Sequence, residues 1–260
     1  MRTIIVANQK GGVGKSTTAI NLVAGLARKN KKALLIDSDP QGHSTLGLNI
    51  STENHPTLAE LLTDDSVTAN QVIQHTYIPG LDIIPCDLSL AMADIKMATM
   101  EGKEFKLRNK INSLHDTYDF AVIDCSPTFG TMTINAFTTG DSIILPIKLG
   151  YLSLEGVSNF LDTVNFVNRD INKMINHKIG ISGTLITFYD IRTKIARAVV
   201  ASLNEVFGDK VFHTKIPQNV KINEAQSYGK SIFDFDPKCK GAMAYESLVE
   251  EVLTRESERK

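Results

Sequence analysis

The sequence predicts a doubly wound α/β fold, in which helices cover both faces of a mostly parallel central sheet. Two observations support this prediction. Short runs rich in Val, Ile and Leu alternate with longer helical patterns along the whole chain. Most of these runs are continuously apolar, which is typical of strands that are buried on both faces. Repetition of strand and helix then favours right-handed crossovers within one sheet.

The expected elements follow one another without a repeat or a linker. The expected strands are Thr3–Asn8, Lys32–Asp37, Leu81–Pro85, Phe120–Asp124, Ser142–Pro146, Ile179–Thr187 and Val211–Thr214. Helical patterns occupy Ser16–Lys29, Thr57–Leu62, Leu88–Met97, Lys103–His115, Leu152–Arg169, Arg192–Phe207 and about Gly241–Arg255. We therefore expect a single domain over residues 1–260, a length near the upper end for one hydrophobic core.

Composition excludes several classes of protein. Hydrophobic residues make up 42% and charged residues 22%, which is ordinary for a globular chain and not for a disordered or fibrous one. The net charge of −1 gives no global basic field, so any nucleic-acid site must be local. Three widely spaced cysteines suit a reducing cytosol. The first strand starts so early that we expect no signal peptide, and no apolar run reaches the ~18 residues of a membrane span.

The most specific motif lies between the first strand and the first helix and reads Lys10-Gly11-Gly12-Val13-Gly14-Lys15-Ser16-Thr17. Its glycines let backbone N–H groups turn toward an anion, and the helix N-terminus adds its dipole. Lys15 would bind the β- and γ-phosphates, and the Ser16 hydroxyl would ligate Mg²⁺. Gln9 replaces the first glycine of the common pattern and Lys10 adds a second lysine, so this is a deviant phosphate loop. A purely structural glycine turn would not explain the Lys-Ser pair.

Two further strands end in carboxylates, namely Asp37 with Asp39 before Pro40, and Asp124. The carboxyl ends of parallel strands face the ligand crevice. Asp39 could orient or deprotonate a water that attacks the γ-phosphate, Asp37 could bind metal-bound water, and Asp124 could hold Mg²⁺ through water. Each pattern alone also fits an aspartate at a loop entry or a helix cap. Their combination with the phosphate loop favours metal–nucleotide chemistry.

Together these segments resemble the ParA/Soj branch of the deviant Walker-type ATPases, relatives of MinD, over nearly the whole chain. The resemblance rests on Ala7–Thr18, Asp37–Gly42, Leu154–Gly156, Tyr189–Thr193, Ile216–Val220, Lys240–Ala242 and Ala244–Tyr245. Two departures are visible. Ser126 stands where the family usually has the first of two prolines, and Ser16 replaces the commoner Thr while keeping a hydroxyl.

The resemblance implies a P-loop NTPase that binds ATP and Mg²⁺ and hydrolyses ATP to ADP and phosphate. It implies that Lys10 reaches across an ATP-sandwich homodimer to the partner's phosphates, while Lys15 holds phosphate in its own subunit. Asp39 would be tied to hydrolysis, and Pro217 and Asn219 would contact the adenine. The implied catalytic residues are Lys10, Lys15 and Asp39, and the implied metal-binding residues are Ser16, Asp37 and Asp124. The implied nucleotide-binding residues are Lys10, Gly11, Gly12, Val13, Gly14, Lys15, Ser16, Thr17, Pro217 and Asn219.

The resemblance also implies non-specific DNA binding in the ATP state and stimulation by a ParB-type centromere-binding partner. Residues 188–240 contain nine basic and six acidic side chains, a local basic excess. A solvated basic face is the plainer interpretation of that excess. Because the loop begins at residue 10, we expect no separate arm for sequence-specific DNA binding. The candidate DNA contacts are Arg192, Lys194, Arg197, Lys221 and Lys230.

The sequence thus predicts a cytoplasmic, nucleoid-associated switch ATPase for plasmid or chromosome partition. The alternative is a ParA-like positioning factor for a non-DNA cargo such as an organelle or a division or membrane machine. MinD-like membrane binding is not expected, because residues 241–260 carry five acidic and three basic residues and lack Phe and Trp. An iron–sulfur relative would need a second cysteine near Cys125, which we expect to be a buried strand-end residue. A ligase related to dethiobiotin synthetase is disfavoured by the ParA-like second half.

Overall fold

A computed structural model of the chain describes residues 1–148, 153–190, 192 and 194–258 and shows a central β-sheet. Within these residues eight strands form one sheet in the order β3-β4-β2-β5-β1-β6-β7-β8. The strands are β1 Arg2–Val6, β2 Ala33–Ser38, β3 Gln74–His75, β4 Leu81–Ile84, β5 Phe120–Cys125, β6 Ser142–Lys148, β7 Ile181–Tyr189 and β8 Val211–Pro217. Neighbours pair in parallel except β3 with β4. The predicted doubly wound, mostly parallel fold is confirmed.

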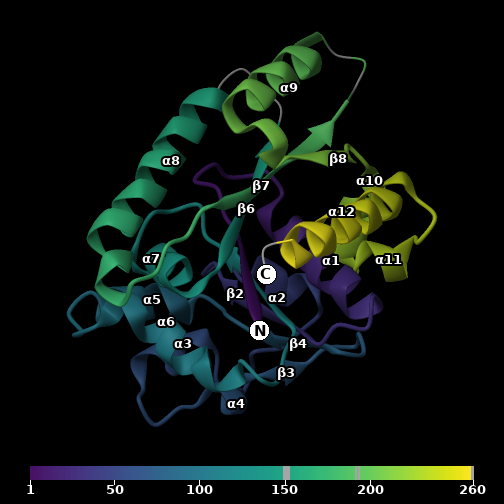
Figure 1. Cartoon of the computed structure of the whole chain (residues 1–260). Helices are drawn as coiled ribbons and strands as arrows, with labels where there is room; N and C mark the ends of the chain where they lie inside the picture. The colour runs from purple at the N-terminus through teal and green to yellow at the C-terminus, as the bar shows by residue number, and fades with distance from the viewer. Residues whose placement is uncertain (149–152, 191, 193, 259–260) are drawn as a thin grey trace.

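Helices cover both faces of this sheet (Figure 1). One face carries α1 Lys15–Arg28, α10 Val220–Ser227, α11 Ile232–Phe235 and α12 Lys240–Ser257. The other carries α3 Leu58–Thr63, α4 Ala69–Val72, α5 Ser89–Met97, α6 Lys106–Ile111, α7 Thr131–Thr139, α8 Ser153–Asp170 and α9 Lys194–Phe207. Successive strand residues alternate between the two cores, since Ile4 and Val6 join the first and Ile5 joins the second. This double burial explains the continuously apolar strands in the sequence.

Several predicted boundaries differ from the structure. The expected helix Lys103–His115 is broken into 3₁₀ turns at Lys103–Phe105 and Asn112–Leu114 around the short α6. A tertiary contact stabilises the new helix start, because the side-chain oxygen of Asn135 on α7 accepts the Leu107 N–H in the first turn of α6 at 3.0 Å. The helices α2 His43–Gly47, α4, α7, α10 and α11 and the strand β3 were not expected from the sequence.

Parts of three expected segments lie outside the described residues. Leu152, where one helix was expected to begin, is among them, and α8 is described from Ser153. Ile191 and Thr193 of the segment Tyr189–Thr193 also lie outside. Thr193 belongs to the expected helix Arg192–Phe207 as well, and α9 is described from Lys194.

The register of the sheet brings the predicted site together. The strand order places β5 between β2 and β1. Asp124 on β5 is in register with Asp37 on β2 and with Val6 at the end of β1. The phosphate loop after β1 and the carboxylates after β2 and β5 therefore share one edge of the sheet. In the part of the chain that the structure describes, no helix is long and apolar enough to cross a membrane.

Candidate nucleotide-binding site

The loop between β1 and α1 encloses the lysine that follows it. Two of its glycines have φ of +69° and +87°, a left-handed conformation that glycine adopts without steric cost. Lys15 opens α1, and its ammonium donates a hydrogen bond of 3.2 Å to the Lys10 carbonyl. Burial lowers the pKa of Lys15, whereas the nearby carboxylates of Asp124 and Asp39 raise it. A partly desolvated cation thus lies in the field of both carboxylates, where a bound polyphosphate would pair with it.

Side-chain hydrogen bonds tie the loop to two other strands. The Asn8 side chain accepts the Lys10 N–H at 2.9 Å and donates to the carbonyl of Pro146 on β6 at 2.8 Å. At the other end, Thr187 on β7 donates to the Val13 carbonyl at 2.9 Å. The Lys10 side chain is exposed, so groups outside this subunit can reach it.

Asp37 is fully buried at the end of β2. Its Oδ2 accepts hydrogen bonds from the N–H and the hydroxyl of Thr45, at 2.8 and 2.7 Å. Burial raises the pKa of Asp37 to about 6, and the bonds from Thr45 oppose that rise. The carboxylate is therefore fixed in orientation beside Asp124, at the edge of the sheet that carries the phosphate loop.

Asp124 is also fully buried, and Ser44 donates to its Oδ2 at 2.7 Å. Burial raises its pKa to about 7, and the charge of Asp37 adds to the rise, while the hydroxyls of Ser44 and Ser16 act against it. Among the described residues its Oδ1 has no hydrogen-bond partner. A buried carboxylate oxygen without a partner is costly unless a cation or an ordered water satisfies it. The pair Ser16 and Asp124 therefore fits the oxygen donors that Mg²⁺ prefers.

A cleft of about 820 Å³ opens above these groups. Asp39 lies in its wall, nearly buried, and its Oδ1 accepts the Gln41 N–H at 3.1 Å. The walls include Gly11, Gly12, Gly14, Lys15, Ser16, Thr17, Asp39, Ser126, Pro127, Thr128 and Phe188. The structure thus brings together most of the predicted loop residues and Asp39, with Asp37 and Asp124 buried at the adjoining strand ends.

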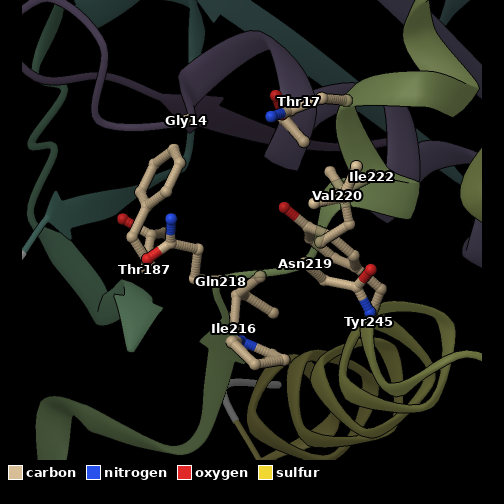
Figure 2. Close-up of a pocket in the computed structure, with 12 residues that line it drawn as sticks. Gly14, Thr17, Thr187, Ile216, Gln218, Asn219, Val220, Ile222 and Tyr245 are labelled. Carbon is tan, nitrogen blue, oxygen red and sulfur yellow. The ribbon is translucent and has the colours of Figure 1, made fainter. Parts of the chain in front are cut away.

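A second cavity, of about 80 Å³, adjoins the cleft at Gly14 and Thr17 (Figure 2). Figure 2 shows these residues on one side of the cavity, with Ile216, Asn219 and Tyr245 on the opposite side. Pro217 also lines it, and the Asn219 side chain accepts the Lys221 N–H at 2.9 Å as the cap of α10. The predicted adenine contacts therefore stand beside the phosphate cleft, in a mostly apolar pocket that suits a base.

The predicted DNA contacts are spread over several elements. Arg192 is exposed and forms a two-point ion pair with Asp190, with N–O distances of 2.9 and 2.7 Å. Lys221 is exposed at the start of α10 and binds Glu224 at 2.8 Å. Arg197 on α9 and Lys230 between α10 and α11 are exposed as well. The side chain of Lys194, the first residue of α9, lies outside the described part.

The sequence did not predict two residues of the site. Ser44 and Thr45 on α2 hold the carboxylates of Asp124 and Asp37. Their signal in the sequence is weak, since it amounts to two adjacent hydroxyl residues shortly after the second strand. Cys125 is buried and its thiol pKa is raised by burial, so the expectation of a buried strand-end cysteine is confirmed.

A phosphate loop at the carboxyl edge of a parallel sheet, with a strand-end carboxylate beside its serine, defines a P-loop nucleotide hydrolase. Comparison with known proteins narrows this class. Residues 1–177 match the family described as an AAA domain. The chain is 40% identical to the sporulation initiation inhibitor protein Soj of Bacillus subtilis, over 96% of this chain and 98% of that protein. It is 39% identical to the chromosome-partitioning ATPase Soj of Treponema pallidum, over 99% of both. The chain belongs to the Soj/ParA family of partition ATPases.

Solved structures share the fold. The fold matches cobyrinic acid a,c-diamide synthase of Mycobacterium smegmatis, solved with an ATP analogue and magnesium, at a TM-score of 0.85 and 29% identity. That match covers 100% of this chain and 97% of the other. The septum site-determining protein MinD of Pyrococcus horikoshii, complexed with Mg-ADP, matches at a TM-score of 0.76 and 26% identity, over 96% and 95% of the two chains.

Proposed function

We propose that this chain is an ATP-dependent dimerising switch that partitions plasmid or chromosomal DNA. In this proposal residues 1–260 form one ParA-type ATPase domain that works in the cytoplasm and on the nucleoid. The observation that carries it is the Oδ1 of buried Asp124, which has no hydrogen-bond partner among the residues that the structure describes and lies beside Ser16, near the cleft that contains Lys15. This arrangement is what a metal-bound nucleoside triphosphate requires.

The cofactors are ATP and Mg²⁺. The N–H groups of residues 11–17 and the Lys15 ammonium would hold the phosphates, while Ser16 and Asp124 would hold Mg²⁺, with Asp37 supporting metal-bound water. The metal supplies charge neutralisation between phosphate oxygens. Asp39, in the wall of the cleft, would orient the attacking water. The adenine would occupy the pocket beside Pro217 and Asn219.

A second copy of the chain would close over the open side of the cleft. The surface around the opening of the cleft carries several exposed apolar side chains. Leu46 is 66% exposed and Leu88, Met92 and Ile95 are 67–69% exposed. The last three are spaced by four and three residues and so share one face at α5, while Leu46 and Ala91 line the cleft itself. An apolar patch of this kind marks an interaction surface. We call Leu88, Met92 and Ile95 the α5 stripe.

Lys10 would act across this dimer. Two bound triphosphates face each other in a sandwich and repel, and an exposed lysine from each loop would offset that repulsion. The γ-phosphate would then signal dimerisation, and hydrolysis would remove the best charge pairs. Lys10→Ala should keep ATP binding and lose the ATP-dependent dimer in gel filtration. A normal dimer would contradict the role of Lys10.

Non-specific DNA binding would follow dimerisation. The local basic excess supports it, and Arg192, Lys194, Arg197, Lys221 and Lys230 are the proposed contacts, which would bind backbone phosphates without reading bases. A ParB-type centromere-binding protein would stimulate hydrolysis and so release the DNA.

The proposal is tested with the Asp39→Ala protein and random-sequence duplex DNA, in ATP, in ADP and without nucleotide, across a salt series. ATP-dependent binding that ignores sequence and weakens steeply with salt is expected. Absence of binding in every state would overturn the DNA part of the proposal. Positioning of a non-DNA cargo would then be favoured.

A further inference from the structure

Phe188, near the end of β7, has an unusual backbone. Five non-glycine residues of the described part have positive φ, and four of them are asparagines, which tolerate this conformation. The fifth is Phe188, with φ of +51°. A bulky residue is strained there, and such strain persists where the surroundings enforce it, typically at binding sites and switches.

The surroundings of Phe188 belong to the proposed nucleotide site. Its neighbour Thr187 donates to the Val13 carbonyl of the phosphate loop at 2.9 Å. The Phe188 ring lies so close to Gly14 that a Cβ there would be 3.6 Å from the ring. The Lys148 ammonium stands 4.6 Å from the ring centroid. Phe188 lines both the phosphate cleft and the adjoining pocket, so it stands between the proposed places of phosphates and base.

The residues after Phe188 lead directly to a predicted DNA contact. Asp190 lies two residues on, and it holds Arg192 through both carboxylate oxygens and through the Arg192 N–H at 3.0 Å. A change of φ at Phe188 rotates the chain that follows it, and with it this ion pair.

We propose that Phe188 is the positioning residue that couples occupation of the nucleotide cleft to the orientation of the Asp190–Arg192 pair. One nucleotide must span both cavities that the ring adjoins, so its entry displaces the ring and relaxes the backbone from the left-handed region. The relaxed chain swings Asp190 and changes how Arg192 is presented. The inference rests on the proposed function, in that it takes the ligand to be ATP and the purpose of Arg192 to be DNA binding.

The chain has no tryptophan, so Tyr189→Trp supplies a single tryptophan next to Phe188, which can be excited apart from the tyrosines. ATP should shift the emission of this reporter. With ATP at a concentration that saturates each variant, as a separate nucleotide titration verifies, adding Phe188→Gly should abolish the shift, because glycine takes positive φ freely and has no ring to displace. Phe188→Tyr keeps the ring and should restore the shift. Asn176→Gly, at another positive φ of +50°, is the matched control and should leave the shift unchanged.

A shift that survives Phe188→Gly, or a reporter that binds ATP without any shift, would overturn the coupling. Should Tyr189→Trp itself impair ATP binding, amide hydrogen exchange of residues 188–192 replaces the emission readout. In that measurement ATP should change the hydrogen-exchange rates of these amides in the parent chain and not in Phe188→Gly. Equal changes in both proteins would overturn the coupling. A parent chain that fails to bind ATP contradicts the proposed function instead. A Tyr189→Trp reporter that shows the shift but binds no DNA contradicts the DNA step and leaves the coupling standing.

Discussion

We call the cleft with the buried Asp37 and Asp124 the phosphate end, and the proposed DNA contacts the basic end, and the two hold their charges in opposite ways. Asp37 and Asp124 are fully buried, and each accepts a hydrogen bond from a hydroxyl on α2. Arg192 and Lys221 are exposed, and each pairs with a carboxylate two or three residues away. Burial of a charge is so costly that its partners must be built into the fold, whereas exposed pairs are screened by water, contribute little to stability and exchange easily.

This difference decides what each region can do. The buried carboxylates are fixed before a nucleotide arrives, which is what catalysis and metal binding need. The exposed cations can leave their local partners for DNA phosphates. Salt ions weaken both the local ion pairs and the contacts with DNA. We therefore expect mutations at the phosphate end to act strongly at any salt concentration, and mutations at the basic end to act weakly and in a salt-dependent way.

The largest effect is expected for Asp39→Ala. ATP turnover should fall by about 10²–10⁴-fold, the usual contribution of a positioned general base, while ATP binding is retained. Phosphate release and nucleotide titration measure the two quantities separately. Asp209→Ala, an exposed acid at Gly208–Lys210, serves as the control. Normal turnover in the Asp39 variant would contradict its role in the cleft.

Lys15→Ala should come next, with ATP affinity reduced by roughly 10- to 150-fold. The reason is the loss of a charge-assisted hydrogen bond, worth about 1.5–3 kcal/mol, in a partly desolvated site. Calorimetric titration with Mg-ATP measures it, and thermal unfolding confirms that the variant is folded. Lys173→Ala removes an exposed lysine after α8 and should leave affinity unchanged. Equal affinities in both variants would refute the assignment of Lys15.

The same contrast explains what the sequence could predict. The phosphate loop is contiguous, and the three aspartates end apolar strands, so sheet geometry alone brings them to one edge. Ser44 and Thr45 could not be found in this way, because they reach the carboxylates through α2, a five-residue helix. So short a helix depends on its tertiary contacts and leaves little periodic signal.

Helix α7 shows the corresponding limit for the fold. It contains four threonines and an asparagine, residues of low helix propensity, so the pattern did not predict it. Its stability comes from contacts far along the chain. Asn135 donates to the Lys103 carbonyl at 2.7 Å and accepts the Leu107 N–H, and Thr138 donates to the Glu104 carbonyl at 2.7 Å. Tertiary hydrogen bonds override propensity there, while the buried strands needed no such information.

The α5 stripe extends the comparison to the dimer. Met92→Glu in the Asp39→Ala background should weaken the ATP-dependent dimer by about tenfold or more, because an unpaired polar group buried in an interface costs about 1–3 kcal/mol. Sedimentation velocity with ATP measures it. Met243→Glu, at a methionine that is 60% exposed on α12, is the matched control. A dimer unaffected by Met92→Glu, but affected by Met243→Glu, would move the interface from α5 to α12.

The smallest effect is expected for Arg197→Ala, which removes one exposed cation from α9. In the Asp39→Ala background with ATP, DNA affinity should fall a few-fold at low salt. The slope of log affinity against log salt should become shallower by about 0.9, the value for one neutralised phosphate. Filter binding across a salt series measures both, with Lys173→Ala as the control cation away from α9. A lower affinity with an unchanged slope would mean that Arg197 acts through the fold or the dimer and not on phosphate, and would remove it from the proposed DNA contacts.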